Sequence, residues 1–179
     1  MLVDLTSIDE RGKDFSFFLD SRWWHEVAPD EPSIDIESKI EVLMSIYKAG
    51  SHFVVDGKME GVLLLSCDRC LERFSYPISS PFKVYLEQIP DLIDMEEVEL
   101  SEEDLDIEYI QGEELELNDL LREQIFLSIP FKNLCSEQCK GLCPVCGENL
   151  NIRDCGCSRS NGHPAFQKLA ALKGKLRSL

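Results

Sequence analysis

Eight cysteines in two groups constrain this chain more than any other feature of its sequence. Six fall between residues 135 and 157, spaced Cys-x3-Cys-x3-Cys-x2-Cys-x8-Cys-x-Cys, and the other two form a separate Cys-x2-Cys pair. Two residues between thiolates let both sulfurs reach one tetrahedral ion, and a glycine after the second cysteine permits the tight turn of a zinc knuckle. The sequence therefore predicts one or two structural zinc ions held by Cys67, Cys70, Cys135, Cys139, Cys143, Cys146, Cys155 and Cys157.

The N-terminal sequence and the apolar runs of the chain indicate its cellular compartment, which determines the chemistry of these thiols. The N-terminus has no basic segment followed by an apolar one, so we expect no signal peptide. The run Val62–Leu65 is far short of the roughly 20 apolar residues of a membrane span. We therefore expect a cytoplasmic protein, whose clustered thiols stay reduced and serve as metal ligands or redox groups rather than as structural disulfides.

A thioredoxin-like redox site is the alternative reading of a Cys-x2-Cys pair. That motif needs a strand followed at once by a helix whose N-terminus lowers the thiol pKa. The pair at 67–70 instead lies between two strand-like segments, 62–66 and 74–78, which favours a knuckle at a hairpin turn. No catalytic constellation accompanies the cysteines, so the predicted sites are structural and the chain is not predicted to be an enzyme.

The sequence leaves the grouping of the eight thiolates open. One arrangement joins Cys143 and Cys146 to two cysteines from among 135, 139, 155 and 157. Another joins Cys67 and Cys70 to Cys143 and Cys146, which would clamp the C-terminal segment on the sheet. Eight ligands can thus form two four-cysteine sites, or one site with spare ligands.

Charge divides the chain into unlike parts. The net charge is −16, from 34 acidic and 18 basic residues, which argues against broad, sequence-independent binding to nucleic acid. Residues 84–121 hold 15 acidic residues and no Lys or Arg, whereas residues 122–179 hold nine basic and four acidic residues. We therefore expect any RNA contact to be confined to the C-terminal third, and the acidic middle to attract a basic protein.

This division of charge gives two sets of candidate binding residues, one acidic and one basic. The simpler interpretation is that the acidic set lies on a solvated loop and the basic set on a solvated helix. The acidic loop, about 87–106, offers partner-binding candidates: Glu96, Glu97, Glu99, Glu102, Glu103, Asp104 and Asp106. The C-terminal third offers RNA-binding candidates: Arg159, Lys168, Lys173, Lys175 and Arg177. Neither a membrane contact nor a small-molecule substrate is predicted.

Hydrophobic periodicity predicts an antiparallel meander. Alternating apolar residues indicate strands at 36–48, 52–55, 59–66 and 74–86, with one more at 107–110. Asp56-Gly57 is a turn signal between the second and third of these strands. Pro77 and Pro81 favour an edge or an interruption in the fourth.

Two helices complete the expected α+β fold. An apolar stripe predicts a packed helix at about 117–129 that ends at Pro130, and a basic amphipathic pattern predicts a short helix at 163–177. We thus expect a strongly curved antiparallel sheet or partial barrel with one packed helix, a cysteine-rich knuckle segment and a short C-terminal helix. The predicted domains are 1–130, with the sheet, acidic loop and packed helix, and 131–179, with the cysteine-rich segment and basic helix.

The combination of these motifs resembles the YceD-like family of large ribosomal RNA subunit accumulation proteins. The matching parts are the turn Cys67-Asp68-Arg69-Cys70-Leu71, the acidic middle, the helix ending at Pro130, the run from Cys139 to Asn151, Cys155-Gly156-Cys157, and the tail from His163 to Lys173. Lys140–Asn151 and the tail are the more specific parts, and the first 35 residues add little.

The resemblance implies a role in the accumulation of large-subunit (23S) ribosomal RNA, through its synthesis, processing or stability, with no catalytic activity. Combined with the charge pattern, it favours a non-enzymatic ribosome-assembly factor that contacts a basic ribosomal protein or a pre-50S particle. RNA would be touched, if at all, through the C-terminal third. The alternatives are a structural-zinc RNA-binding module and, less favoured, a thiol redox protein.

Overall fold

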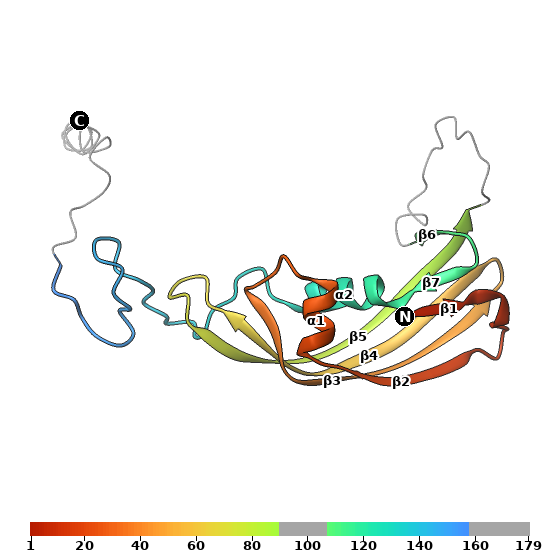
Figure 1. Ribbon diagram of the computed structural model, residues 1–179, viewed down its shortest axis with the longest axis horizontal. Helices are drawn as coiled ribbons and strands as arrows, with labels where there is room; N and C mark the ends of the chain where they lie inside the picture. The colour runs from red at the N-terminus through yellow and green to blue at the C-terminus, as the bar shows by residue number, and fades with distance from the viewer. Residues whose placement is uncertain (90–106, 158–179) are drawn as a thin grey trace, which may run out of the picture. The chain divides into compact units, whose positions relative to one another are not determined.

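The computed structural model describes residues 1–89 and 107–157 of the chain (Figure 1). Contacts divide the chain into two compact units. The sheet unit comprises residues 1–66 and 73–133, and the cysteine unit comprises residues 67–72 and 134–179, of which 67–72 and 134–157 are described. The chain enters the cysteine unit twice, first in the link between two strands of the sheet.

A five-stranded sheet with the strand order β2-β3-β4-β5-β6 forms the sheet unit. Its strands are β2 (Lys13–Leu19), β3 (Ile34–Ala49), β4 (His52–Ser66), β5 (Arg73–Ile89) and β6 (Ile107–Gln111). The strands β3, β4 and β5 are long and visibly curved (Figure 1). Two short strands, β1 (Leu2–Asp4) and β7 (Glu114–Glu116), pair separately, and a 3₁₀ turn, η1 (Leu5–Ser7), follows β1.

One face of this sheet carries the hydrophobic core, as the alternating pattern predicts. Ile40, Val42, Met44 and Ile46 of β3 are all buried, and the cross-strand partners of the last three are Met59, Gly57 and Val55 of β4. The core is completed by residues from β2, β5 and the helices. Strand periodicity therefore located β3 and β5, but it divided β4 into two strands and did not predict β2.

The predicted turn at Asp56-Gly57 is wrong, because β4 runs without interruption from His52 to Ser66. The reversal from β3 to β4 occurs earlier, at Gly50, whose φ is 67°. Gly57 serves packing instead: a Cβ built there would lie 2.6 Å from Cζ of Phe82 and 2.7 Å from Cβ of Met44. Because Gly57 has no side chain, the Phe82 ring can pack directly against the sheet at this position.

The sheet is mixed and open, so the expectation of a wholly antiparallel sheet is wrong and no barrel closes. Strands β2 to β5 are antiparallel neighbours, but β6 pairs parallel to β5, with Tyr85 opposite Ile107. A parallel neighbour cannot follow a tight turn and needs a connection of about a dozen residues or more. The seventeen residues 90–106 between β5 and β6 have that length.

The prolines of β5 lie at an edge, as predicted, but they do not interrupt the strand. Pro77 and Pro81 pair with Val62 and Lys58 of β4, while β6 begins its pairing only at Tyr85. Residues 73–84 therefore have a strand neighbour on one side only among the described residues, where a missing N–H costs no ladder bond. The acidic loop also starts later than predicted, because residues 87–89 still belong to β5.

Two helices lie on one side of the sheet (Figure 1), where a single packed helix was predicted. The predicted helix is α2 (Leu117–Ser128), which buries Leu117, Leu120, Leu121 and Ile125. The unpredicted helix is α1 (Ser21–Val27), whose N-cap is Asp20.

The two tryptophans of α1 fasten that helix to its surroundings. Trp24 is fully buried, its Nε1 donates to the carbonyl of Ile34 at 2.9 Å, and its ring lies 5.5 Å from that of Phe126. Trp23 donates to Oδ1 of Asn118 at 2.9 Å, which ties α1 to the first turn of α2. The predicted C-terminal helix at 163–177 lies outside the described residues. Among the described residues, neither helix is both long and apolar enough to cross a membrane.

Candidate metal centres

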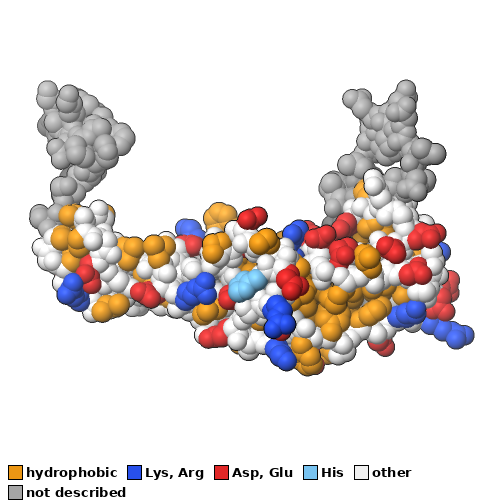
Figure 2. Space-filling model, viewed as in Figure 1, with side chains coloured by type: hydrophobic (Ala, Val, Ile, Leu, Met, Phe, Trp, Pro, Cys, Tyr) orange, Lys and Arg blue, Asp and Glu red, His pale blue; other side chains and the backbone are white. Residues whose placement is uncertain are grey.

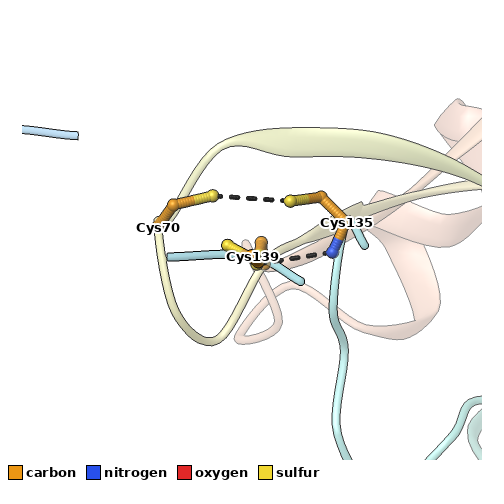
Figure 3. A group of neighbouring side chains, drawn as sticks. Cys70, Cys135 and Cys139 are labelled. Atoms are coloured by element: carbon orange, nitrogen blue, oxygen red, sulfur yellow. Dashed lines mark hydrogen bonds between the residues drawn. The ribbon is translucent and has the colours of Figure 1, made fainter. Parts of the chain in front are cut away.

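The first group of thiols, called site A, consists of Cys67, Cys70, Cys135 and Cys139. All four Sγ atoms lie within 4.8 Å of one another, with 3.8 Å between Cys67 and Cys139 and 3.7 Å between Cys70 and Cys135. Figure 3 shows the sulfurs of Cys70 and Cys135 directed at each other across the site. Three of the four cysteines are buried, and Cys135 is exposed.

These spacings match a tetrahedral ion. Four sulfurs at about 2.3 Å from one Zn²⁺ lie about 3.8 Å apart. The two printed contacts of site A, 3.8 Å and 3.7 Å, have that length, and no thiol is oxidised to a disulfide. Each of the four ligands comes from a loop rather than from a helix or strand, so the ion would replace secondary structure as the organising element.

The second group, called site B, consists of Cys143, Cys146, Cys155 and Cys157, again with all Sγ atoms within 4.8 Å of one another. Cys143 is buried, Cys155 and Cys157 are half-buried, and Cys146 is exposed. Of the arrangements left open by the sequence, the structure joins Cys143 and Cys146 to the last two cysteines. It places Cys67 and Cys70 with Cys135 and Cys139, not with Cys143 and Cys146.

The two Cys-x2-Cys turns have the same backbone geometry. In the first, the N–H of Cys67 donates to the carbonyl of Glu72 at 2.9 Å, and that of Leu71 donates to the carbonyl of Cys67 at 2.9 Å. In the second, the N–H of Cys143 donates to Glu148 at 2.8 Å, and that of Gly147 donates to Cys143 at 2.8 Å. Both turns are therefore knuckles of one type, as expected where two sulfurs must converge on an ion.

The electrostatics of both groups suit a bound cation. Burial raises the pKa of the Cys67 thiol, but backbone N–H groups, that of Cys135 foremost, donate to its sulfur and bring its pKa down to about 6. Backbone N–H groups of Cys146 and Val145 likewise lower the pKa of Cys143 to about 6. Each site thus has one thiol in a knuckle whose sulfur is stabilised as the thiolate, the form that binds metal.

Two other thiols have the opposite shift, one in each site. Loss of hydration at its sulfur and the neighbouring thiols raise the pKa of Cys135 to about 12. Hydrogen bonding with Cys146 and Cys155 raises that of Cys157 to about 12. A bound cation would favour the thiolate form of these crowded thiols, because it offsets their charge.

Basic residues near the sites act mostly through other partners. Arg69 donates from Nη1 to the carbonyl of Cys139 at 2.9 Å, so it braces the backbone of site A. Arg153 pairs with Glu148 at 2.7 Å, and the pKa of its guanidinium is raised first by that carboxylate and then by Cys146 and Cys155. Arg153 thus lies close enough to Cys146 and Cys155 to offset part of the charge of site B.

Asn151 contacts site A, which the sequence analysis did not predict. Its Nδ2 donates to Sγ of Cys139 at 3.2 Å, and its Oδ1 accepts from the N–H of Lys140 at 2.8 Å. Groups that hydrogen-bond metal ligands tune and orient them. The signal in the sequence was the pair Asn149-x-Asn151 directly after the second knuckle, where Asx side chains bond nearby backbone.

The other predicted site residues lie outside the described residues. This holds for the acidic candidates from Glu96 to Asp106 and for the basic candidates from Arg159 to Arg177. Among the described residues, Asp and Glu side chains gather at the end of the sheet unit that carries β6 and β7 (Figure 2). Partial burial and the like charges of Glu123 and Asp119 raise the pKa of Glu108 in β6.

Four thiolates fill the coordination shell of a tetrahedral ion. Structural zinc sites have this closed composition, whereas catalytic ones keep a position for water or substrate. The two groups can therefore hold metal ions that stabilise the cysteine unit, and they present no feature of metal-assisted catalysis.

Comparison with known proteins places these features in a family. The family model described as large ribosomal RNA subunit accumulation protein YceD matches residues 55–173. A chloroplastic protein of Arabidopsis thaliana, named large ribosomal RNA subunit accumulation protein YCED homolog 1, is 28% identical over 160 residues, 77% of this chain and 50% of its own length. The homologue of the same name in Zea mays is 27% identical over 196 aligned positions, 97% of this chain and 64% of its own length.

A bacterial relative extends the comparison. An uncharacterised protein of Mycobacterium tuberculosis is 25% identical over 142 residues, 79% of this chain and 66% of its own length. The chain thus spans about half to two thirds of the length of these relatives. No solved structure matches the chain.

Proposed function

The chain belongs to the family of the large ribosomal RNA subunit accumulation protein YceD, and from this membership we propose that it supports accumulation of large-subunit ribosomal RNA as a non-enzymatic assembly factor. The observation that carries the proposal is the match over residues 55–173, which takes in site A, site B and α2. The plant relatives carry the same functional name.

The metal in this proposal is zinc, with a structural role. All-sulfur tetrahedral ligand sets select zinc or iron–sulfur clusters over hard cations such as Mg²⁺ and Ca²⁺. The Sγ contacts of 3.8 Å and 3.7 Å in site A suit a single Zn²⁺. Cys67, Cys70, Cys135 and Cys139 would hold one ion, and Cys143, Cys146, Cys155 and Cys157 a second.

The partner in this proposal is a basic ribosomal protein, free or within a pre-50S particle, met in the cytoplasm. The argument is charge: residues 84–121 carry 15 acidic residues and no basic one. Partial burial, and after it the like charges of Glu123 and Asp119, raise the pKa of Glu108. A polycationic surface would relieve that repulsion and would be steered towards it. RNA contact, if made, would use the basic C-terminal third from Arg159 to Arg177.

An affinity pull-down from lysate, with and without nuclease, tests this proposal. Recovery of a named large-subunit ribosomal protein after complete nuclease digestion supports protein-first contact. Loss of every ribosomal protein on digestion would contradict protein-first contact and would favour the alternative function, an RNA-binding module. Lowering the salt should strengthen the contact, because it is between charged surfaces.

A further inference from the structure

The loop between the inner ligands of site B reaches across to site A. Residues 147–154 run from Cys146 to Cys155, and within them Asn151 donates from Nδ2 to Sγ of Cys139 at 3.2 Å. The same side chain accepts at Oδ1 from the N–H of Lys140 at 2.8 Å. A ligand of site A thus receives a hydrogen bond from a loop whose two ends are ligands of site B.

A small backbone ribbon holds the loop in register with the first knuckle. Leu142 and Asn149 form a bridge, Leu150 donates to the carbonyl of Gly141 at 2.9 Å, and Leu142 donates to that of Arg69 at 3.1 Å. Gly141 is required at this crossing: its φ is 72°, and a Cβ there would lie 3.0 Å from the Arg69 carbonyl oxygen. The ribbon therefore joins the first knuckle, at Arg69, to the loop that runs between Cys146 and Cys155.

An ion in site B would close residues 147–154 into a loop, because it binds Cys146 and Cys155 at the two ends. Closing a short loop removes most of its alternative conformations before Asn151 has to be positioned. With site B empty, the same loop is held, among the described residues, by hydrogen bonds and one ion pair alone. These are the ribbon, the Arg153–Glu148 pair, the knuckle bonds of Cys143 with Glu148 and Gly147, and the bonds from Lys140 to Asn151 and from Asn149 to Glu72. The N–H···S bond to Cys139 then has to be formed at the cost of ordering the loop.

We propose that the two sites bind metal cooperatively, with Asn151 as the positioning residue that transmits the occupancy of site B to site A. The proposal rests on the assignment of both groups as zinc sites. By linkage the coupling is reciprocal, so that an ion in site A, by fixing Cys139 and through it the 140–142 ribbon, favours an ion in site B by the same factor. Loss of an outer-shell partner typically weakens a metal site about 10- to 100-fold, which sets the expected size of the coupling.

Native mass spectrometry of the reduced, metal-free full chain, titrated with Zn²⁺ alone, tests the proposal. At one equivalent of zinc, cooperative sites give mostly metal-free and two-zinc protein. A dominant one-zinc species at that point would overturn cooperativity and leave the zinc assignment intact. Binding of fewer than two ions at saturation would overturn the assignment itself, so the two failures are distinguishable.

A double-mutant cycle then identifies the route. In the intact chain, Asn151→Ala should weaken the second zinc about 10- to 100-fold in competition with a chelator, and Asn151→Asp, which places a carboxylate oxygen beside the thiolate, at least as much. In a background where Cys155 and Cys157 are serine, Asn151→Ala should change zinc affinity by less than about threefold, because the open loop no longer delivers the side chain.

Ile152→Ala is the matched control, since its side chain lies in the same loop and is 74% exposed. It should leave the zinc affinity and the metal distribution of the intact chain unchanged. An equal effect of Asn151→Ala in both backgrounds would overturn the proposal, because Asn151 would then act on site A independently of site B. The strand signals of the sheet unit in NMR spectra report that each variant is folded.

Discussion

Leu71 and Gly147 occupy the same position in the two knuckles. Each follows the second cysteine, each donates its N–H to the carbonyl of the first, at 2.9 Å and 2.8 Å, and each has a positive φ, 62° and 75°. A glycine takes this left-handed conformation freely, whereas a side chain bears a cost of roughly 1–2 kcal/mol. The first knuckle therefore carries strain that the second avoids.

Exchanging the residue types at these positions should have opposite effects. Leu71→Gly should change the free energy of unfolding of the zinc-loaded protein by between zero and about 1 kcal/mol in the stabilising direction, because relief of strain is partly offset by a more flexible unfolded chain. Gly147→Leu should destabilise by about 1–2 kcal/mol. Denaturant unfolding of the two variants measures both, and a strongly destabilised Leu71→Gly protein would show that the exposed leucine makes a contact of its own.

Metal removal should affect the two units differently. The described core cluster of the sheet unit contains no cysteine, whereas the cysteine unit has loops that converge on eight thiols. Chelation under reducing conditions should therefore collapse the amide NMR signals of residues 134–157 to unfolded positions and leave those of β2 to β5 dispersed.

Zinc should restore the lost signals, and magnesium should not, since Mg²⁺ prefers oxygen ligands. The assignment of the cysteines as structural metal ligands would be contradicted if residues 134–157 kept their native signals in protein that elemental analysis shows to be free of metal.

Asp35 should make the sheet unit sensitive to acid. Burial opposes ionisation of its carboxylate, but the hydroxyl of Ser21 at 2.7 Å and the N–H of Ile36 at 2.8 Å, helped by the charges of His25 and Arg73, lower its pKa. A lowered folded-state pKa gives stability that is present above the unfolded value of about 3.9 and is lost as the pH falls through the folded value.

Asp35→Asn should therefore destabilise by about 1 kcal/mol at pH 7 and by much less at pH 2–3, as measured by chemical unfolding across that range. Asp56→Asn is the control: that carboxylate is 54% exposed and pairs with Lys83 at 3.8 Å, so less than about 0.5 kcal/mol is expected. A pH-independent cost at position 35 would mean that its charge is irrelevant.

Gly57→Ala tests the packing interpretation of the Asp-Gly pair. The added methyl would meet Phe82 and Met44 at less than 3 Å, so displacement of the ring should cost about 1–3 kcal/mol in thermal or chemical unfolding. Shortening Phe82 to Leu in the same molecule should recover part of that cost. If alanine at position 57 were tolerated without loss, the close contact would not constrain the fold.

The acidic middle should govern the rate of partner binding. Replacing four acids of the segment by glutamine, Glu96, Glu97, Glu99 and Glu102, should slow association with the ribosomal protein recovered after nuclease treatment about tenfold at low salt. The control neutralises four exposed acids on the strands of the sheet, Asp14, Glu41, Asp56 and Glu60, and should have a much smaller effect. Equal effects from both sets would show that the net charge of the protein, and not the position of the acidic segment, determines the association rate.

The sequence predicted the parts of the fold that depend on local pattern. The two-residue period located β3, β5 and the two parts of β4, and the four-residue apolar spacing located α2, whereas β2 was not predicted. Helix α1 was missed because its seven residues are too few to display a period, and because Trp24 is buried by tertiary contacts, among them those with Ile34 and Phe126. The parallel pairing of β6 was missed because direction depends on the path of the connection and not on the strand itself.

In the candidate metal sites too, the sequence predicted what depends on local spacing and missed what depends on the tertiary fold. Spacing predicted all eight cysteines as metal ligands, and the structure gathers them into two groups of four. The grouping of Cys67 with Cys139, 72 residues later, depends on the tertiary fold and has no local sequence signal. The contact of Asn151 with Cys139 was not predicted, because it depends on a loop that folds back on site A.

The most direct test of the account is the ratio of large- to small-subunit ribosomal RNA in cells of the source organism that lack this protein. We predict a lowered ratio that is restored by the wild-type chain and not by a chain in which Cys67 and Cys70 of site A are serine. A ratio that stays normal without the protein would contradict the proposed function, and full restoration by the serine variant would contradict the structural role of the metal.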